Sequence, residues 1–243
     1  MELFELFRWL RREGQAAAPS PFQSLKGGIG VLVRALAERI PPSTLKLGRP
    51  IAKIECAGRG FTIFREGDEP YYSDAVVLCT PAHASAKILD GWGTRRLVRA
   101  LASIPYVSTA TVFFGLRRPP QRQSLDGAGF IVPRGEGRML ASTWVSSKWS
   151  GRAPEGEALV RVFLGGAREP ELVESSSDSE LEQLAKEELV RFIGPIDDEL
   201  RMTRVFRWIR SNPQPTLGHA DRLKDNPRRA SGRTCPRARR LGL

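Results

Sequence analysis

The sequence predicts a mixed α/β protein, and three observations support this class. Ala75–Leu78 is a continuous apolar run, as in a strand covered on both faces, and a short helix is expected after it from Ala82 to Leu89. Ser177–Ile193 carries apolar residues at helical spacing. Four segments rich in β-branched and aromatic residues are separated by Pro and Gly turns, as in an antiparallel sheet: VSTATVFFG, GFIVPR, RMLASTWV and EALVRVFLGG.

The clearest predicted helix begins at Ser177. Ser177 and Glu180 have the spacing of a capping box, in which each side chain satisfies a backbone N–H of the other residue. Gly194 and Pro195 then end the helix. The apolar stripe consists of Leu181, Leu184, Ala185, Leu189 and Phe192, and the acidic residues expected on the solvated side are Glu180, Glu182, Glu187 and Glu188.

Two glycines, Gly27 and Gly28, precede another helical pattern that runs from Ile29 to Ile40. Backbone N–H groups at a glycine-led helix start can bind phosphate. The spacings G-x-G-x-x-G and G-x-x-x-x-G-K-[ST] are both missing here, and a proline-containing linker stands where the preceding strand should be. We therefore expect a tight turn with positive φ, followed by a helix that ends at Pro41.

Further strands are expected in RPIAKIEC, GFTIFREG and YYSDAVVLCT before Ala82, and in MTRVFRWI near the end of the pattern. Cys79 follows the apolar run of Ala75–Leu78 and is expected to be a buried small hydrophobe.

The net charge of +11 is concentrated at one end of the chain. Residues 222–243 contain eight basic residues and one acidic residue, so seven of the eleven net positive charges lie there. A basic nucleic-acid-binding protein is therefore the least favoured function, and no specific nucleic-acid partner is expected. The Arg-, Pro- and Ala-rich composition of this tail is typical of disorder, or of an altered reading frame in a GC-rich gene.

No self-sufficient catalytic or metal-binding group is predicted. His83 and His219 are far apart in sequence, and neither has metal-ligand spacing to a cysteine or an acid. The three cysteines are too few for a disulfide framework, and G-x-S-x-G and P-loop motifs are missing. Any chemistry would come from a cofactor. No signal-peptide core and no membrane-spanning run occurs, so we expect a cytoplasmic protein.

Several motifs, taken in order, resemble those of the protoporphyrinogen oxidases, which have the flavin-containing amine-oxidase fold. They are SLKGGIGVLVRALAERI, RPIAKIE, DAVVLCTPAHASAKIL, GFIVPR, SSKWSGRAP, VRVFLGGAR and RVFRWIRSNPQPTLGH. The resemblance implies part of a Rossmann-like FAD-binding domain, together with a mixed-sheet substrate-binding domain. It implies FAD as cofactor and oxidation of protoporphyrinogen IX to protoporphyrin IX in haem biosynthesis.

The resemblance also implies a division of the chain. A helical segment and linker would occupy residues 1–23, and the FAD-binding part residues 24–90. The substrate-binding domain would cover residues 91–205, the return to the FAD domain residues 206–221, and the basic tail residues 222–243.

Five site residues are carried over from the matching motifs. For the cofactor, Ile51 matches the adenine-contacting strand, and Trp208 matches a tryptophan near the flavin. For the substrate, Gly129, Ile131 and Phe163 match positions beside the macrocycle. On local pattern alone, ordinary strand or core positions explain Ile51 and Trp208 equally well and are favoured for Ile131 and Phe163. Pro215 departs from the family pattern, which usually has Tyr at that place.

Missing motifs limit the expected activity. No strand with G-x-G-x-x-G is present, so the chain resembles the middle and later portion of such an enzyme and is expected to be inactive alone. The alternative is a non-catalytic tetrapyrrole-binding or assembly module. Phe4, Phe7 and Trp9, set among arginines, are consistent with peripheral contact with the inner face of the cell membrane, or with a helical segment that packs inside the protein. Homodimer formation is a further expectation.

Overall fold

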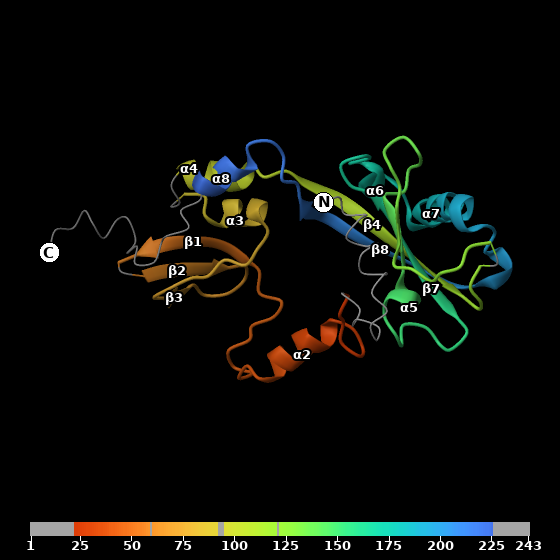
Figure 1. Ribbon diagram of the computed structural model, residues 1–243. Coiled ribbons are helices and arrows are strands. Elements are labelled where there is room, and N and C mark those ends of the chain that lie inside the picture. Colours follow the sequence, from red (N-terminus) through yellow and green to blue (C-terminus); the bar gives the residue numbers. More distant parts are fainter. Residues whose placement is uncertain (1–21, 59, 92–94, 121, 226–243) are drawn as a thin grey trace, which may run out of the picture.

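The computed structural model describes residues 22–58, 60–91, 95–120 and 122–225, which form two sheets with their helices and a separate helix, α2 (Figure 1). The expected α/β class is confirmed. The motifs at the amino-terminal end, including Phe4, Phe7 and Trp9, lie outside the described residues, as does most of the basic tail.

The smaller unit contains a three-stranded antiparallel sheet of order β1-β2-β3. Three side chains, Ile54, Ile63 and Ile88, form its buried cluster. Its strands are β1 (Ile51–Ala57), β2 (Gly60–Arg65) and β3 (Tyr71–Ser73), and its helices are α3 (Ala82–Ile88), α4 (Arg95–Ala102) and α8 (His219–Asp225).

The larger unit is built on a five-stranded sheet of order β5-β6-β7-β4-β8. All its described pairings are antiparallel, whereas the expected substrate domain had a mixed sheet. Its strands are β4 (Tyr106–Leu116), β5 (Gly129–Ile131), β6 (Ala141–Trp144), β7 (Ala158–Gly165) and β8 (Leu200–Pro213). Between them lie α5 (Val145–Lys148), α6 (Leu172–Ser175), α7 (Asp178–Ile193) and the 3-10 helix η1 (Asp197–Glu199).

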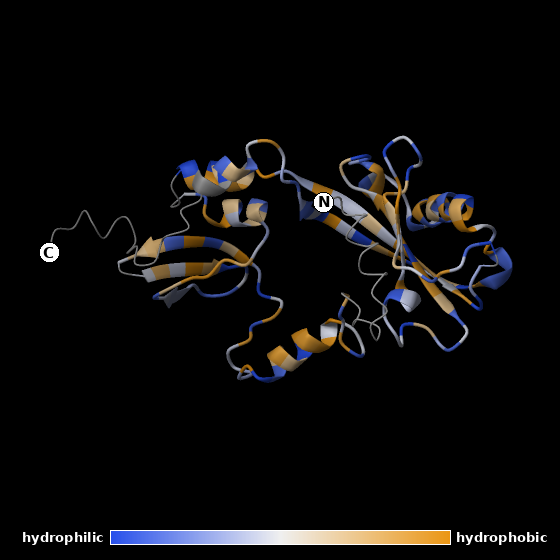
Figure 2. Cartoon of the chain, viewed as in Figure 1, coloured by the Kyte–Doolittle hydropathy of each residue, from blue (hydrophilic) through white to orange (hydrophobic). Residues whose placement is uncertain are grey.

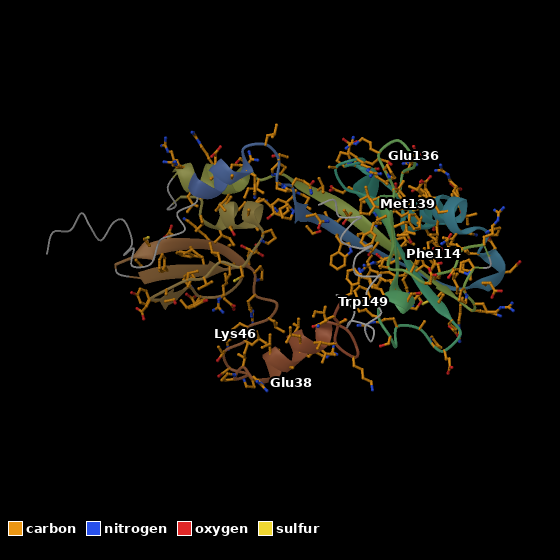
Figure 3. The ribbon with its side chains drawn as sticks, in the orientation of Figure 1. Glu38, Lys46, Phe114, Glu136, Met139 and Trp149 are labelled. Atoms are coloured by element: carbon orange, nitrogen blue, oxygen red, sulfur yellow. The ribbon has the colours of Figure 1, made fainter. Side chains whose placement is uncertain are left out.

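One face of the larger sheet packs against α6 and α7, and the main core lies between them (Figure 1). Because strand side chains alternate between faces, every second residue of β4 enters this core. Phe114 and Met139, which are labelled in Figure 3, are fully buried in it. The other fully buried members include Ala110, Val112, Leu116, Val160, Val162, Leu164, Leu181, Ala185, Leu189 and Ile193.

The capping box at the start of α7 is confirmed. The backbone N–H of Glu180 donates to Ser177 Oγ at 3.2 Å, and the backbone N–H of Ser177 donates to Glu180 Oε2 at 2.7 Å. The helix ends before Gly194, as predicted.

Glu188 is buried, so its expected place on the solvated side of α7 is wrong. Only 7 % of the residue is exposed, and its Oε2 accepts the backbone N–H groups of Arg138 at 2.7 Å and Met139 at 3.2 Å. Oε1 accepts a hydrogen bond from Arg191 at 2.9 Å. Desolvation by burial raises the pKa of Glu188, but these donors outweigh it and hold the pKa below its ordinary value.

Ala75–Leu78 is not a buried strand, so this prediction is also wrong. None of residues 74–79 belongs to a strand, and Val77 is 85 % exposed. Cys79 is exposed as well. A strand needs a neighbour for its N–H and C=O groups, and none of the described strands pairs with this segment.

The predicted turn before α2 (Gly30–Glu38) is confirmed, since Gly27 and Gly28 have φ values of 84° and 91°. No residue of α2 is buried, and its Leu32, Val33 and Leu36 are exposed; Figure 2 shows the hydrophobic colouring of this helix. Arg152 contacts the turn by donating to Ser24 Oγ at 2.6 Å and to the Leu25 carbonyl at 3.0 Å.

Two expected boundaries fall inside regular elements. β8 runs unbroken through the expected boundary between residues 205 and 206, and α8 includes residues 222–225, which were assigned to the tail.

The Glu188 contacts predict a stability effect. Glu188→Ala removes the acceptor of the buried Met139 N–H and of the partly buried Arg138 N–H, so the free energy of unfolding should fall by about 2–4 kcal/mol. Urea denaturation followed by circular dichroism measures it. Glu187→Ala, at an exposed glutamate that accepts a surface hydrogen bond from Gln183, is the matched control and should change stability by less than about 0.5 kcal/mol. Equal effects of the two variants would contradict the structural role of Glu188.

The same carboxylate predicts a pH dependence. Because the folded-state pKa of Glu188 is depressed, its contribution is fully present above the unfolded-state pKa, about 4.3, and is lost as the pH falls through the folded-state value. The difference in unfolding free energy between the wild type and Glu188→Gln should therefore be largest near pH 7 and shrink below about pH 4. Urea titrations at pH 7, 5, 4 and 3 measure it. A difference that stays constant over this range would show that the carboxylate charge plays no part.

Candidate functional site

The face of the five-stranded sheet that points away from α6 and α7 is open, and it gathers four of the five predicted site residues. Ile131 is 80 % exposed and Phe206 49 % exposed, although both lie in strands. We call this surface the open face. It comprises Thr109, Thr111, Phe113, Gly129, Ile131, Ala141, Thr143, Arg161, Phe163, Arg204, Phe206 and Trp208.

Strand register aligns these residues in rows across the sheet. Ile131 pairs with Ala141, Ala141 with Phe163, Phe163 with Thr111, and Thr111 with Phe206. Cross-strand partners lie on the same face, so these five side chains form one continuous row, here called the apolar row. It crosses four strand spacings, or roughly 19 Å. Ile131 and Phe163, predicted as substrate residues, both belong to it.

A second row, called the basic row, lies two residues along each strand. It is aligned by the same four pairs of strands and consists of Gly129, Thr143, Arg161, Phe113 and Arg204. Gly129 has a φ of 125°, and a Cβ at this position would stand 2.1 Å from the Ser142 carbonyl oxygen. The close approach of β6 therefore explains why glycine is needed at this position, independently of any ligand.

A hollow of about 650 Å³ lies on the open face near the end of β8. The Trp208 indole N–H donates to Thr111 Oγ1 at 3.1 Å, which fixes the ring against the sheet. The rings of Phe113 and Phe206 meet edge to face with centroids 5.7 Å apart. The hollow is lined by Thr109, Thr111, Phe113, Arg161, Phe163, Phe206, Trp208, Ser211 and Asn212. Trp208, predicted as a cofactor residue, thus shares one hollow with Phe163.

Arg161 places a cation in this aromatic hollow. Its guanidinium carbon lies 4.5 Å from the ring centroid of Phe163 and 5.7 Å from that of Phe113. Burial lowers the pKa of Arg161, and its Nε is buried without a hydrogen-bond partner. The sequence interpretation missed Arg161, although period-two alternation in VRVFLGG places it on the same face as Phe163.

Ile51 lies apart from the open face, in the smaller unit. It begins β1, an edge strand that pairs with β2 alone among the described strands, and it packs on the small isoleucine cluster. A second hollow, of about 560 Å³, lies beside it. Arg49 and Arg65 line this hollow and both pair with Asp68, at 3.3 Å and 3.6 Å. The remaining lining residues are Thr44, Lys46 and Tyr71.

Neither His83 nor His219 lines either hollow. The His83 ring meets Tyr106 edge to face at 4.8 Å, and burial, Arg210 and Lys87 lower its pKa. Among the described residues, no group of three or more His, Cys, Asp or Glu side chains is arranged to hold a metal ion. Within that same part of the chain, no helix has the length and apolar character needed to cross a membrane.

Comparison with known proteins agrees with this fold and these motifs. The profile of the flavin containing amine oxidoreductases matches residues 1–235. Among solved structures, an Exiguobacterium sp. 255-15 protein with a provisional protoporphyrinogen oxidase name is similar over 92 % of this chain and 46 % of its own, with a TM-score of 0.72 and 29 % identity. Reduced UDP-galactopyranose mutase shares the fold at a TM-score of 0.68 and 17 % identity, over 82 % of this chain and 43 % of its own.

Curated relatives carry two related enzyme names. Coproporphyrinogen III oxidase of Bacillus subtilis is 27 % identical over 84 % of this chain and 43 % of its own length. The enzyme of the same name from Mycobacterium tuberculosis (strain H37Rv) is 31 % identical over 82 % and 42 %. Chloroplastic protoporphyrinogen oxidase of Nicotiana tabacum is 28 % identical over 82 % and 38 %. The chain thus spans less than half the length of these relatives.

These similarities confirm the resemblance to protoporphyrinogen oxidases and add coproporphyrinogen III oxidases to it. The expected flavin cofactor is confirmed at the level of the family. The match extends over nearly the whole sequence, and the chain belongs to the flavin-containing amine oxidoreductase family.

Proposed function

We propose that this chain carries the substrate-binding sheet of an FAD-dependent oxidase that converts a porphyrinogen into a porphyrin in haem biosynthesis. The observation that carries the proposal is the open face, where Ile131 and Phe206 of the apolar row are exposed and Trp208 lies beside them. The names of the curated relatives supply the substrate class, which includes protoporphyrinogen and coproporphyrinogen.

The open face suits a broad apolar ligand. Burying the exposed surfaces of Ile131, Phe163 and Phe206 against a tetrapyrrole would remove apolar area from water on both partners, which favours binding. Phe163 lies at the centre of the apolar row, on the middle strand β7, so a macrocycle centred there would contact Phe163 as well as Ile131 and Phe206 at the two ends. In this proposal, the side chains of Ile131 and Phe163 contact the substrate. Gly129 lies beside the substrate in the neighbouring row.

The chain offers residues for only part of an FAD molecule. Trp208, held by Thr111, would shield one side of the flavin, and Ile51 would meet the adenine with the outer edge of β1. The described residues contain no glycine-rich loop between a strand and a helix, so they provide no cradle for the pyrophosphate. When bound, FAD would supply the hydride acceptor.

The protein's part is then positioning and exclusion of water. The side chains of the open face include no histidine and no carboxylate, so none of them is assigned to acid–base catalysis. The division into a partial FAD-binding domain before residue 91 and a substrate-binding domain after it belongs to this proposal. Membrane contact through Phe4, Phe7 and Trp9, a cytoplasmic location and a homodimer remain predictions.

Porphyrin binding tests the function directly. The purified chain is titrated with protoporphyrin IX in a non-ionic detergent, and the Soret band reports binding. Phe163→Ala should weaken binding by roughly tenfold or more, because a central aromatic contact is lost. Tyr72→Ala, which removes an exposed aromatic side chain from β3 in the other sheet, is the control and should bind as the wild type does.

Parallel titration with FAD separates the outcomes. Porphyrin binding without FAD binding would favour the non-catalytic tetrapyrrole-binding module. If a folded sample binds no porphyrin, or if both variants weaken binding equally, the proposed function is wrong.

A further inference from the structure

We propose that Arg161 binds a carboxylate of the substrate, so that the open face selects a tetrapyrrole by its acidic side chains as well as by its apolar ring. This inference rests on the proposed function and assigns the specificity-determining residue of the same site.

Arg161 differs from five paired arginines of the larger unit in having no anion beside it, and it lines the aromatic hollow. Arg118, Arg138, Arg191, Arg201 and Arg207 each pair with a carboxylate, from Glu199, Glu169, Glu188, Glu157 and Asp178 respectively. The side chain of Arg161 forms no ion pair and no hydrogen bond within the described part of the chain, and its buried Nε is unsatisfied. A half-buried cation without a partner is unfavourable for the protein alone.

The surroundings of Arg161 strengthen its attraction for an anion. The guanidinium lies close to the rings of Phe163 and Phe113, which restrict its conformations and keep water from part of its surface. Thr111, Phe206 and Trp208 add no negative charge to the hollow that Arg161 lines. In a site with little water, a charge-assisted hydrogen bond to a carboxylate is stronger than on an open surface.

The position of Arg161 relative to the apolar row fits a short acidic substituent. Arg161 is two residues from Phe163 along β7, a Cα separation of roughly 6.6 Å. A carboxylate on a two-carbon arm can span such a distance from the edge of a ring that lies on Phe163. The propionate side chains of porphyrinogens have this form, and coproporphyrinogen carries more of them than protoporphyrinogen does.

The contacts of Arg161 with Phe113 and Phe163 could alternatively serve only to stabilise the pairing of β4 with β7. These two roles predict different responses to one substitution. If Arg161 only stabilises the strand pairing, Arg161→Gln should lower the stability of the protein. If Arg161 is instead an unpaired half-buried charge kept for a ligand, Arg161→Gln should leave the stability unchanged or raise it.

The experiment compares coproporphyrin III with its tetramethyl ester, which has the same ring but no ionisable carboxylate. Each is titrated in a non-ionic detergent into the wild-type chain, Arg161→Gln, Arg161→Lys and Arg134→Gln. Arg134 is exposed in the loop after β5 and has no ion pair or hydrogen bond to a described residue, so its variant controls for net charge. Thermal unfolding of each variant is recorded alongside.

The wild type should bind the acid roughly tenfold more tightly than the ester. Arg161→Gln should lose this preference by binding the acid more weakly and the ester unchanged, with no loss of thermal stability. Arg161→Lys should retain part of the preference, because it keeps the charge but not the planar guanidinium. Arg134→Gln should match the wild type.

Two results would overturn the assignment of Arg161 while leaving the proposed function intact. One is equal binding of acid and ester by the wild type. The other concerns Arg161→Gln. The assignment fails if this variant keeps the preference for the acid, and it also fails if the variant loses thermal stability together with binding of both the acid and the ester. Binding of neither porphyrin by a folded wild type would instead overturn the proposed function and, with it, this inference.

Discussion

The alternation of side chains along β4 is the constraint on which the larger unit depends. β4 is paired on both edges, with β7 on one side and β8 on the other. Its even-numbered residues from Ala110 to Leu116 are fully buried or nearly so against the helices, while Thr111 and Phe113 line the open face. A slip of one residue in this register would exchange the two sets, exposing the core and burying the site.

The core side of β8 holds this register in place. Arg207 donates from Nε to Asp178 Oδ1 and from Nη2 to the Ser176 carbonyl oxygen, both at 2.7 Å. These contacts join β8 to the start of α7. The arginine that points toward the helices is therefore compensated, and Arg161, which points the other way, is not. This difference in pairing separates a structural cation from one available to a ligand.

Local patterns predicted those elements whose cause is local. The capping box of Ser177 and Glu180 and the β-branched strands of the larger sheet are encoded within a few residues, and they form as expected. Glu188 could not be placed correctly, because its donors come from Arg138 and Met139, about fifty residues away. Ala75–Leu78 failed for a related reason: the run was expected to be covered on both faces, but no described strand pairs with it, and Val77 is exposed while Val76 and Leu78 pack on the isoleucine cluster. The exposed apolar face of α2 shows the same mismatch.

The site was only partly accessible to sequence reasoning. Matching motifs identified Ile131, Phe163 and Trp208 separately, and the strand register brings them onto one face. Thr111 and Phe206 join them only through cross-strand pairing, which a single sequence does not display, whereas Arg161 shares the face of Phe163 by alternation along β7. Ile51 lies in the other sheet, so a cofactor bound through both Ile51 and Trp208 would have to extend from one unit to the other.

The most direct test of the account is to locate a bound porphyrin by paramagnetic NMR. A paramagnetic manganese coproporphyrin is added to the chain with isotope-labelled methyl groups, and line broadening reports proximity to the metal. The account predicts strong broadening at Ile131 on the open face and much less at Leu181 and Leu189, which lie on α7 in the layer behind the sheet. Broadening centred on α2 or on the α7 side of the sheet, with Ile131 unaffected, would contradict the assignment of the open face as the tetrapyrrole site.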